Sequence, residues 1–140
     1  MYKTHHQKKE DIKRSWRLFD ASGKSIGKLA SEIATVLMGK EKSDFSYHLD
    51  QGDHVIVVNA AQINIKPRKL AAKKYFNYSG YPGGMKASKQ SDLIKDNPKI
   101  IIEKAVYNMV ASNRLRKARM KRLHVYADDK HPYAKQLESK

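Results

Sequence analysis

The chain has 140 residues, of which 40% are hydrophobic, and its 29 Lys and Arg against 14 Asp and Glu give a formal net charge of +15. This length suits a single domain with one core. The absence of cysteine excludes disulfides, iron–sulfur clusters and thiolate zinc sites, and no stretch approaches the ~20 apolar residues of a membrane span. So large a surplus of positive charge favours a polyanionic partner.

Residues 1–14 are expected to form a basic N-terminal arm that precedes a single domain over residues 15–140. The arm is basic and polar as far as Lys9, and Glu10 and Asp11 follow where a secretory signal would need an apolar run. A cytoplasmic location is therefore the default expectation.

The first predicted elements are a short strand and an amphipathic helix. Residues 16–19 have the aromatic-rich composition of a strand, and turn-forming residues follow them. Apolar residues then recur at three- and four-residue steps from Ile26 to Met38, which predicts a helix. Ser25 is placed to cap its N-terminus, and Gly39 stands where a left-handed C-terminal cap belongs.

A second strand is predicted at residues 55–58, which are β-branched and apolar without alternation. A strand that is apolar on both faces is normally buried between two layers, as in a parallel sheet covered by helices. Residues 63–65 are expected to form a further short extended piece, and Pro67 offers no backbone donor beyond it.

Two helices are predicted in the C-terminal half. The first starts at Asn97-Pro98, where an N-cap is followed by proline at the first helical position, and its apolar stripe ends at Val110. The second is capped by Ser112 or Asn113 and spans residues 114–122.

The chain is predicted to end in a strand over residues 123–126 and a frayed tail over residues 134–140. The resulting order is strand, helix, strand, basic loop, helix, helix, strand. This alternation favours an α/β sandwich with a small, mostly parallel sheet.

Two long windows of the sequence contain no carboxylate. A surface that only solubilises a protein mixes both signs of charge, whereas a window of one sign stores repulsion that a polyanion relieves by releasing condensed counterions. The first window, between Asp53 and Asp92, contains Lys66, Arg68, Lys69, Lys73, Lys74, Lys86 and Lys89. The second, between Glu103 and Asp128, contains Lys104, Arg114, Arg116, Lys117, Arg119, Lys121 and Arg122.

Three segments have the composition of a nucleic-acid contact. In residues 78–86, glycines let the backbone approach a phosphate closely, and Tyr81 can stack on an unpaired base. A helix over residues 114–122 would present cations on most of its circumference, so it needs an external partner. His131-Pro132-Tyr133 is interpreted as a rigid turn whose ring donors and phenol meet phosphate or base.

The segment from Gly23 to Lys28 suggests nucleotide chemistry only weakly. Three residues separate Gly23 from Gly27, where a Walker phosphate loop has four, and Leu29 stands where Ser or Thr would hold magnesium. We interpret it as a turn and helix start, and keep a nucleotide-dependent enzyme as an alternative. A free regulator that binds DNA or messenger RNA is a third hypothesis, although no helix-turn-helix, zinc finger or dimerising heptad accompanies it.

Neither catalysis nor metal binding is expected from the residues. The histidines are scattered, and none has the i, i+4 spacing of a metalloprotease. Asp50 and Asp53 are interpreted as turn residues before a buried strand, without an evident partner. No serine has the flanking glycines of a nucleophile elbow. We therefore expect no cofactor, no metal and no small-molecule substrate.

An ordered set of motifs extends over nearly the whole chain. It consists of Trp16 with Asp20, Ile26–Ser31, Gly39-Lys40, Asp50–Ala60, Lys74-Tyr75, Ser79–Gly84, Ala105-Val106 with Met109, Asn113–Leu115, Leu123–Tyr126 and His131-Pro132. This set resembles the ribosomal protein L13 family of the large subunit. The resemblance implies a three-layer α/β/α fold with a parallel four-stranded sheet. It also implies a structural, non-enzymatic role in binding large-subunit rRNA beside neighbouring ribosomal proteins and in supporting subunit assembly.

On this interpretation the rRNA-binding residues lie in the two windows and at the turn near residue 131. They are Lys66, Arg68, Lys69, Lys73, Lys74, Tyr78, Ser79, Gly80, Tyr81, Gly83, Gly84, Lys86, Asn113, Arg114, Arg116, Lys117, Arg119, Lys121, Arg122 and His131. The chain departs from the family's usual pattern where Lys66-Pro67 replaces Thr-Gly. It departs again where Lys28 replaces an arginine, which keeps the charge but loses the planar fork.

Overall fold

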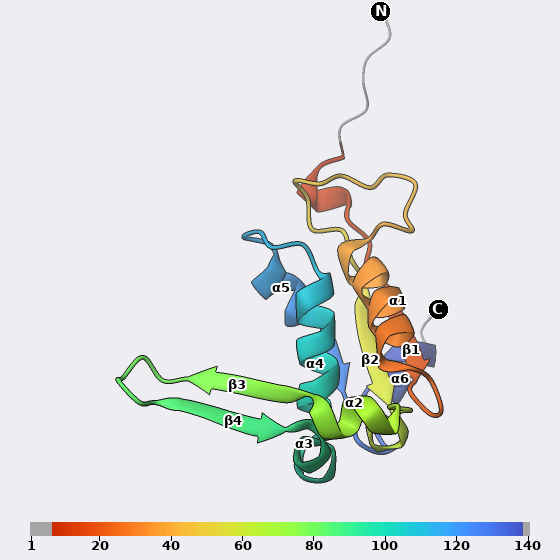
Figure 1. The fold of residues 1–140 in the computed structure, drawn as a ribbon. Helices are drawn as coiled ribbons and strands as arrows, with labels where there is room; N and C mark the ends of the chain where they lie inside the picture. Colours follow the sequence, from red (N-terminus) through yellow and green to blue (C-terminus); the bar gives the residue numbers. More distant parts are fainter. Residues whose placement is uncertain (1–6, 139–140) are drawn as a thin grey trace, which may run out of the picture.

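The computed structural model describes residues 7–138, and three parallel strands form its central sheet in the order β1–β2–β5 (Figure 1). These strands are β1 (Trp16–Asp20), β2 (His54–Val58) and β5 (Leu123–Val125). Val55 lies beside Leu123 and Trp16 beside His54, so β2 occupies the centre. This position explains why β2 is apolar on both faces, as predicted. The parallel sheet of the described chain has three strands, so the expectation of four is corrected.

Helices α1 (Ile26–Met38) and α4 (Pro98–Met109) lie against one face of the sheet (Figure 1). α1 ends at Gly39, whose φ of 78° is left-handed, as predicted, and Ser25 occupies the N-cap position, but its side chain makes no capping hydrogen bond. The core on this face includes Leu29, Ile33 and Leu37 of α1, Val55 and Val57 of β2, and Ile102 and Val106 of α4, each at most 1% exposed. Burial of each such side chain contributes about 1.5–3 kcal/mol.

The opposite face of the sheet carries a row of aromatic rings. Trp16 stacks on His54 with ring centroids 4.2 Å apart, and Tyr133 lies 4.9 Å from Trp16. The short helix α6 (Ala134–Glu138) follows Tyr133 and contacts β1, so the tail predicted to fray contains a helix. Leu18 remains 48% exposed on β1. The described chain is therefore a mixed α/β fold with unequal cover on the two faces of its sheet.

A second group of elements follows β2 and precedes α4 in the sequence. It comprises η2 (Ala60–Gln62), α2 (Pro67–Ala72), β3 (Lys74–Tyr78), β4 (Met85–Lys89) and α3 (Gln90–Asp96). β3 and β4 pair antiparallel and form a hairpin that projects away from the sheet (Figure 1). The sequence predicted a basic loop here, so the hairpin and its two flanking helices are a correction. Residues 63–65, predicted to be extended, bridge to the loop before α1 through Ser22 and Ser25.

The remaining elements are short. α5 (Arg116–Met120) is shorter than the helix predicted over residues 114–122. η1 (Lys9–Asp11) lies in the segment expected to be an arm, and the first six residues of that arm lie outside the described range. No helix within residues 7–138 is long and apolar enough to cross a membrane.

Candidate nucleic-acid interface

The hairpin has two chemically different faces. Because side chains alternate along a strand, Phe76, Tyr78 and Met85 share one face, and they are 59%, 64% and 64% exposed. Tyr75 and Lys86 lie on the other face. Lys74 and Lys89 lie on the same face as the three apolar side chains, at the base of the hairpin, so this face is apolar toward the tip and both faces carry lysine.

The tip of the hairpin is a compact turn that depends on glycine. Gly80 and Gly83 have φ of 90° and 72°, which other residues rarely adopt. A Cβ on Gly84 would lie 2.1 Å from the Ser79 hydroxyl oxygen. The Gly84 N–H donates to the Tyr81 carbonyl at 2.9 Å, and the Tyr81 side chain is 75% exposed. The turn thus presents an aromatic ring and bare backbone outward.

The base of the hairpin and α4 enclose a hollow of about 480 Å³. Its lining includes Lys73, Lys74, Tyr75, Lys104 and Tyr107. The ammonium groups of Lys73 and Lys104 each lie 5.1 Å from the centroid of the Tyr75 ring. Cations held over an aromatic face remain available to an anion that enters the hollow.

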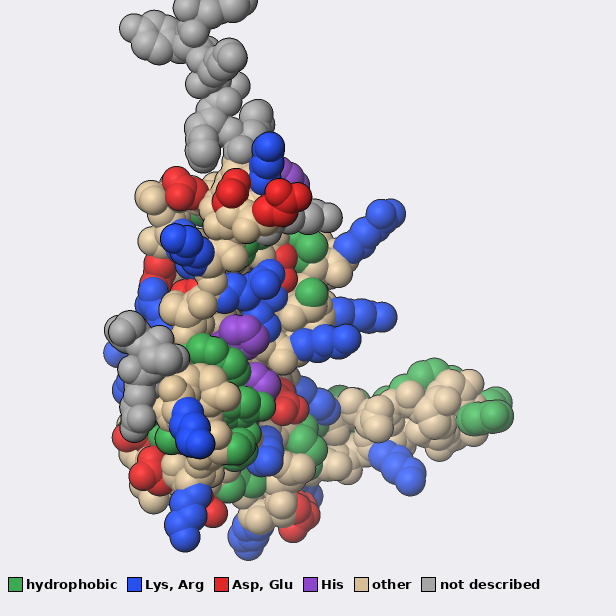
Figure 2. Space-filling model, turned by 180° about the vertical axis from the view of Figure 1, so that it is seen from behind, with side chains coloured by type: hydrophobic (Ala, Val, Ile, Leu, Met, Phe, Trp, Pro, Cys, Tyr) green, Lys and Arg blue, Asp and Glu red, His purple; other side chains and the backbone are tan. Residues whose placement is uncertain are grey.

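A second hollow, of about 500 Å³, lies between α4 and α5. It is lined by Lys104 and Tyr107 of α4, together with Lys117 and Lys121, and Glu103 contributes one carboxylate. Since both hollows share Lys104 and Tyr107, the two acid-free windows meet along α4. Figure 2 shows Lys and Arg side chains projecting on the side of the molecule from which the hairpin extends.

Arg116 lies over the Tyr107 ring at the edge of the hollow between α4 and α5. Its guanidinium carbon lies 4.4 Å from the Tyr107 ring centroid, and its Nη2 donates to the Val110 carbonyl at 2.8 Å. The Asn113 side chain accepts a hydrogen bond from the Leu115 N–H at 3.1 Å and so shapes the turn before α5. Arg114 is exposed beside it.

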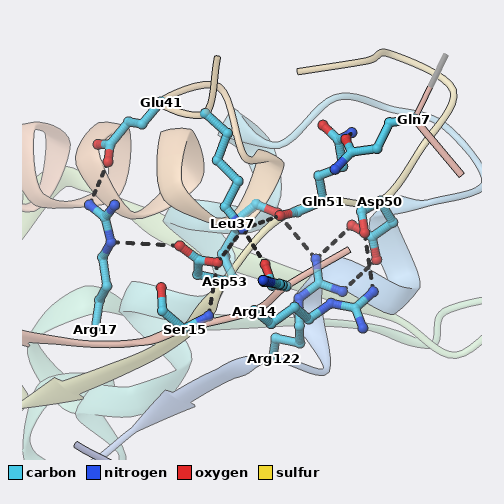
Figure 3. Close-up of polar contacts among 12 residues, drawn as sticks. Gln7, Arg14, Ser15, Arg17, Leu37, Glu41, Asp50, Gln51, Asp53 and Arg122 are labelled. Carbon is cyan, nitrogen blue, oxygen red and sulfur yellow. Dashed lines mark hydrogen bonds and ion pairs between the residues drawn. The ribbon is translucent and has the colours of Figure 1, made fainter. Parts of the chain in front are cut away.

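Two arginines predicted to bind rRNA are buried, and Figure 3 shows one of them, Arg122, beside Asp50. Arg119 and Arg122 are 2% and 7% exposed. Arg122 pairs with both carboxylate oxygens of Asp50, with Nη2 donating to Oδ1 at 2.6 Å, and Arg119 Nε donates to the same oxygen at 3.4 Å. Burial alone would raise the pKa of Asp50, but the hydrogen bond and charge of Arg122 and the charge of Arg119 lower it overall. Arg119 of α5 and Arg122, just before β5, therefore join these elements to the loop before β2.

Asp53 anchors a neighbouring cluster (Figure 3). It accepts hydrogen bonds from Lys42 Nζ at 2.6 Å and from the Ser15 N–H at 3.1 Å, and Arg17 Nε lies 3.7 Å away. Burial opposes its ionisation, yet the Lys42 and Ser15 hydrogen bonds lower the pKa of Asp53 overall. Asp50 and Asp53, for which the sequence indicated no partner, are thus the anchors of two internal ion-pair clusters.

The other predicted residues are more dispersed. Lys66, Lys69 and Lys73 line a third cavity, beside the start of α1, and Lys73 also lines the hollow at the base of the hairpin. Arg68 is exposed on α2. His131 lies in the loop before α6, and its ring centroid is 6.3 Å from that of Tyr126. Within residues 7–138 no group of three or more His, Asp or Glu could hold a metal ion.

Sequence reasoning missed part of the lining. Lys104 lies inside the second window but is not among the residues predicted to bind rRNA, and neither Tyr75 nor Tyr107 is among them. The usable signal was the helical spacing of Lys104 and Tyr107, three residues apart on the solvent side of α4. Only the fold, however, brings Tyr75 to Lys104.

Fold and surface together define a small, basic, mixed α/β protein with a projecting hairpin and hollows lined by lysine and tyrosine. A family model described as Ribosomal protein L13 matches residues 14–132. The chain belongs to this family.

Named relatives agree with the family model. The chain is 46% identical over 135 residues to the large ribosomal subunit protein uL13 of Chlorobium phaeobacteroides (strain BS1), which covers 96% of this chain and 90% of that protein. It is 46% identical over 135 residues to the protein of the same name from Pelotomaculum thermopropionicum, with 96% and 94% covered. The corresponding protein of Tolumonas auensis is 44% identical over 134 residues, with the same coverage.

Proposed function

We propose that this chain is a structural, non-enzymatic constituent of the large ribosomal subunit, where it binds large-subunit rRNA and supports subunit assembly. Membership of the ribosomal protein L13 family and the names of its relatives support this function. The main structural support is that lysines from both acid-free windows line two hollows that share Lys104 and Tyr107. Cations that are far apart in the sequence therefore lie on one surface. The ribosome is accordingly its place of action.

The proposed binding surface combines phosphate contacts with stacking. Lys73, Lys74, Lys104, Lys117 and Lys121 neutralise phosphates along the two hollows. The hairpin tip allows close approach of the backbone, and its exposed tyrosine stacks on an unpaired base. The two arginines paired with Asp50 are left out of this surface because their guanidinium groups are occupied inside the protein.

The rest of the proposal concerns organisation and partners. Residues 15–140 act as one rRNA-binding domain, and residues 1–14 act as a basic arm. Neighbouring large-subunit proteins are its protein partners.

Sedimentation of a cell lysate tests the assignment. The lysate is run through a gradient in high-salt buffer with magnesium retained, and the chain is followed by mass spectrometry. Stoichiometric co-migration with the large subunit that is lost after ribonuclease treatment supports the proposal. A chain that stays at the top of the gradient refutes it.

A salt titration of the purified chain on naked large-subunit rRNA tests the surface itself. If about six to ten phosphates are contacted, affinity falls by ~10³–10⁵ between ~50 and ~200 mM salt. The triple variant Lys73→Gln, Lys104→Gln and Lys117→Gln should flatten the log–log salt slope by roughly 2 to 3, since each lost contact removes about 0.7–0.9.

A matched control removes the same charge elsewhere. Lys40, Lys130 and Lys135 are exposed and line neither hollow, so their triple replacement by Gln should leave the slope close to that of the wild type. Equal slopes for the two triple variants would mean that binding follows net charge alone and not the proposed surface.

A further inference from the structure

A cavity of about 340 Å³ lies beside the N-terminus of α1, away from the hollow between α4 and α5. It is lined by Ser25, Ile26, Gly27, Lys28, Asn64, Ile65, Lys66, Lys69, Lys73 and Gln90. No carboxylate is among these residues. Lys73 also lines the hollow at the base of the hairpin, so the cavity continues from the proposed rRNA surface.

One wall of the cavity is suited to an anion. α1 is 13 residues long, so its first turn presents the positive end of a substantial helix dipole, and the Ser25 side chain does not cap it. A Cβ on Gly27 would meet no atom within 4 Å, so this part of the turn is open. Lys28 comes from α1, and Lys66 and Lys69 come from the start of α2.

The cavity is also lined by a residue whose acceptor needs a hydrogen-bond donor, and this residue is Gln90, the first residue of α3. Gln90 is 2% exposed, its backbone N–H donates to the Lys73 carbonyl at 3.0 Å, and its side-chain Oε1 has no hydrogen-bond partner in the described chain. A buried acceptor without a donor is costly and uncommon in folded proteins. Gln90 lines the cavity while Oε1 itself is turned out of reach, so a rotation of the Gln90 side chain would present this acceptor to a ligand that offers a donor beside an anion.

A ribose-phosphate unit of RNA meets both requirements. Its phosphate accepts from ammonium and backbone N–H groups, and its 2′-hydroxyl donates a hydrogen bond. A DNA backbone lacks the 2′-hydroxyl and so offers no such donor at this position. The pairing of lysines with an unpartnered glutamine oxygen thus favours RNA.

We propose that this cavity binds one nucleotide of rRNA backbone, with the phosphate at the α1 N-terminus and Lys28, and with the ribose 2′-hydroxyl donating to Gln90 Oε1. The inference rests on the proposed rRNA-binding function and deepens it. It makes Gln90 a residue that distinguishes RNA from DNA.

Two variants test the two halves of the site. Gly27→Ala places a methyl group where the phosphate approaches, and should weaken binding of large-subunit rRNA about tenfold and lower the salt slope by about 0.7–0.9. Its thermal stability should not fall, because the added methyl meets no neighbouring atom. Gln90→Leu keeps a similar volume but removes the acceptor, and should weaken rRNA binding about three- to tenfold.

Analogue interference locates the contact. In vitro transcribed large-subunit rRNA with sparse random 2′-deoxy substitutions is sorted by binding to the full chain. One position should weaken binding to the wild type about three- to tenfold when deoxy, and should have no effect on binding to Gln90→Leu. A wild-type interference pattern that Gln90→Leu leaves unchanged overturns the proposed ribose contact.

The outcomes separate this inference from the proposed function. If the wild type binds rRNA and both variants bind equally well, the cavity holds no nucleotide, and the rRNA-binding function stands. If the wild type does not bind rRNA, the proposed function fails, and this inference fails with it. Saturable binding of ATP with magnesium to the wild type, lost in Gly27→Ala, would assign the cavity to a free nucleotide instead.

Discussion

Replacing Asp50 by Asn is expected to destabilise the fold by about 3 kcal/mol, because it leaves two buried guanidinium groups without their counter-charge. Arg119 and Arg122 are 2% and 7% exposed, and both donate to Asp50. Asparagine has nearly the shape of aspartate, so the substitution removes the charge without opening a cavity. It also turns one acceptor into a donor that faces Arg122.

The magnitude follows from the burial of the pair. Removing one partner of a buried ion pair costs about 3–5 kcal/mol. The lower end applies here because the Asp50 side chain is 15% exposed and Arg122 Nη2 keeps its hydrogen bond to the Leu37 carbonyl at 3.2 Å. A domain of this kind has a free energy of unfolding of about 5–15 kcal/mol, so the variant still folds and can be measured.

Urea denaturation measures the change. With a slope near 1.5 kcal/mol per M, a loss of about 3 kcal/mol lowers the midpoint by about 2 M at an unchanged slope. Asp44→Asn is the control: it makes the same chemical change in the same loop, but at an exposed residue, and should alter stability by no more than about 0.5 kcal/mol. A loss below about 1 kcal/mol for Asp50→Asn, or equal losses for both variants, would refute an internal role for the two arginines.

Burial lowers the pKa of His54 and His124, so the unfolded chain takes up their protons first as the pH falls below about 6.5. The free energy of unfolding should then decrease by up to about 1.4 kcal/mol per pH unit for each histidine, and urea titrations of His124→Gln should show a shallower decrease; an unchanged one contradicts this assignment. Gly52→Ala places a Cβ 1.8 Å from a backbone carbonyl oxygen and should cost about 3 kcal/mol, whereas Gly27→Ala, with no atom within 4 Å, should not; similar melting temperatures for the two would show that the close approach at Gly52 is not limiting. Tyr81→Ala should leave stability unchanged within about 0.5 kcal/mol and weaken rRNA binding by about 1–3 kcal/mol, and an unaltered affinity would exclude stacking by this ring.

The elements that the sequence predicted well are those with a pattern of their own. The helix over Ile26–Met38 has an apolar stripe and is followed by a glycine, which readily adopts the left-handed conformation that ends a helix. β2 is apolar on both faces. The hairpin was missed because its strands have no such pattern. Residues 85–89 are all exposed, and their extended form depends on pairing with residues 74–78. The two strands are joined by the six residues 79–84, a longer connection than the two-residue turns that predict a hairpin from sequence.

The candidate site divides in the same way. Net charge predicted that residues 66–74 and 114–122 would be basic surface, but the sequence does not say which cation meets an acid after folding. Arg119 and Arg122 find their partner 69 and 72 residues away in Asp50. The second window contains no carboxylate of its own, and the carboxylate that pairs with its two buried arginines belongs to a distant part of the chain.

This distribution of acids explains why the remaining cations stay available. Among the described residues, every ion pair uses Glu41, Asp50 or Asp53, and all of these acids precede β2 in the sequence. Within residues 7–138, the lysines of α2, of the hairpin and of the α4–α5 hollow therefore have no counter-charge within an ion-pair distance. Their repulsion persists in the free chain and is relieved when phosphates replace the condensed counterions around them. The internal ion pairs thus fix the fold, and by using these acids they leave the cations of the proposed rRNA surface unneutralised.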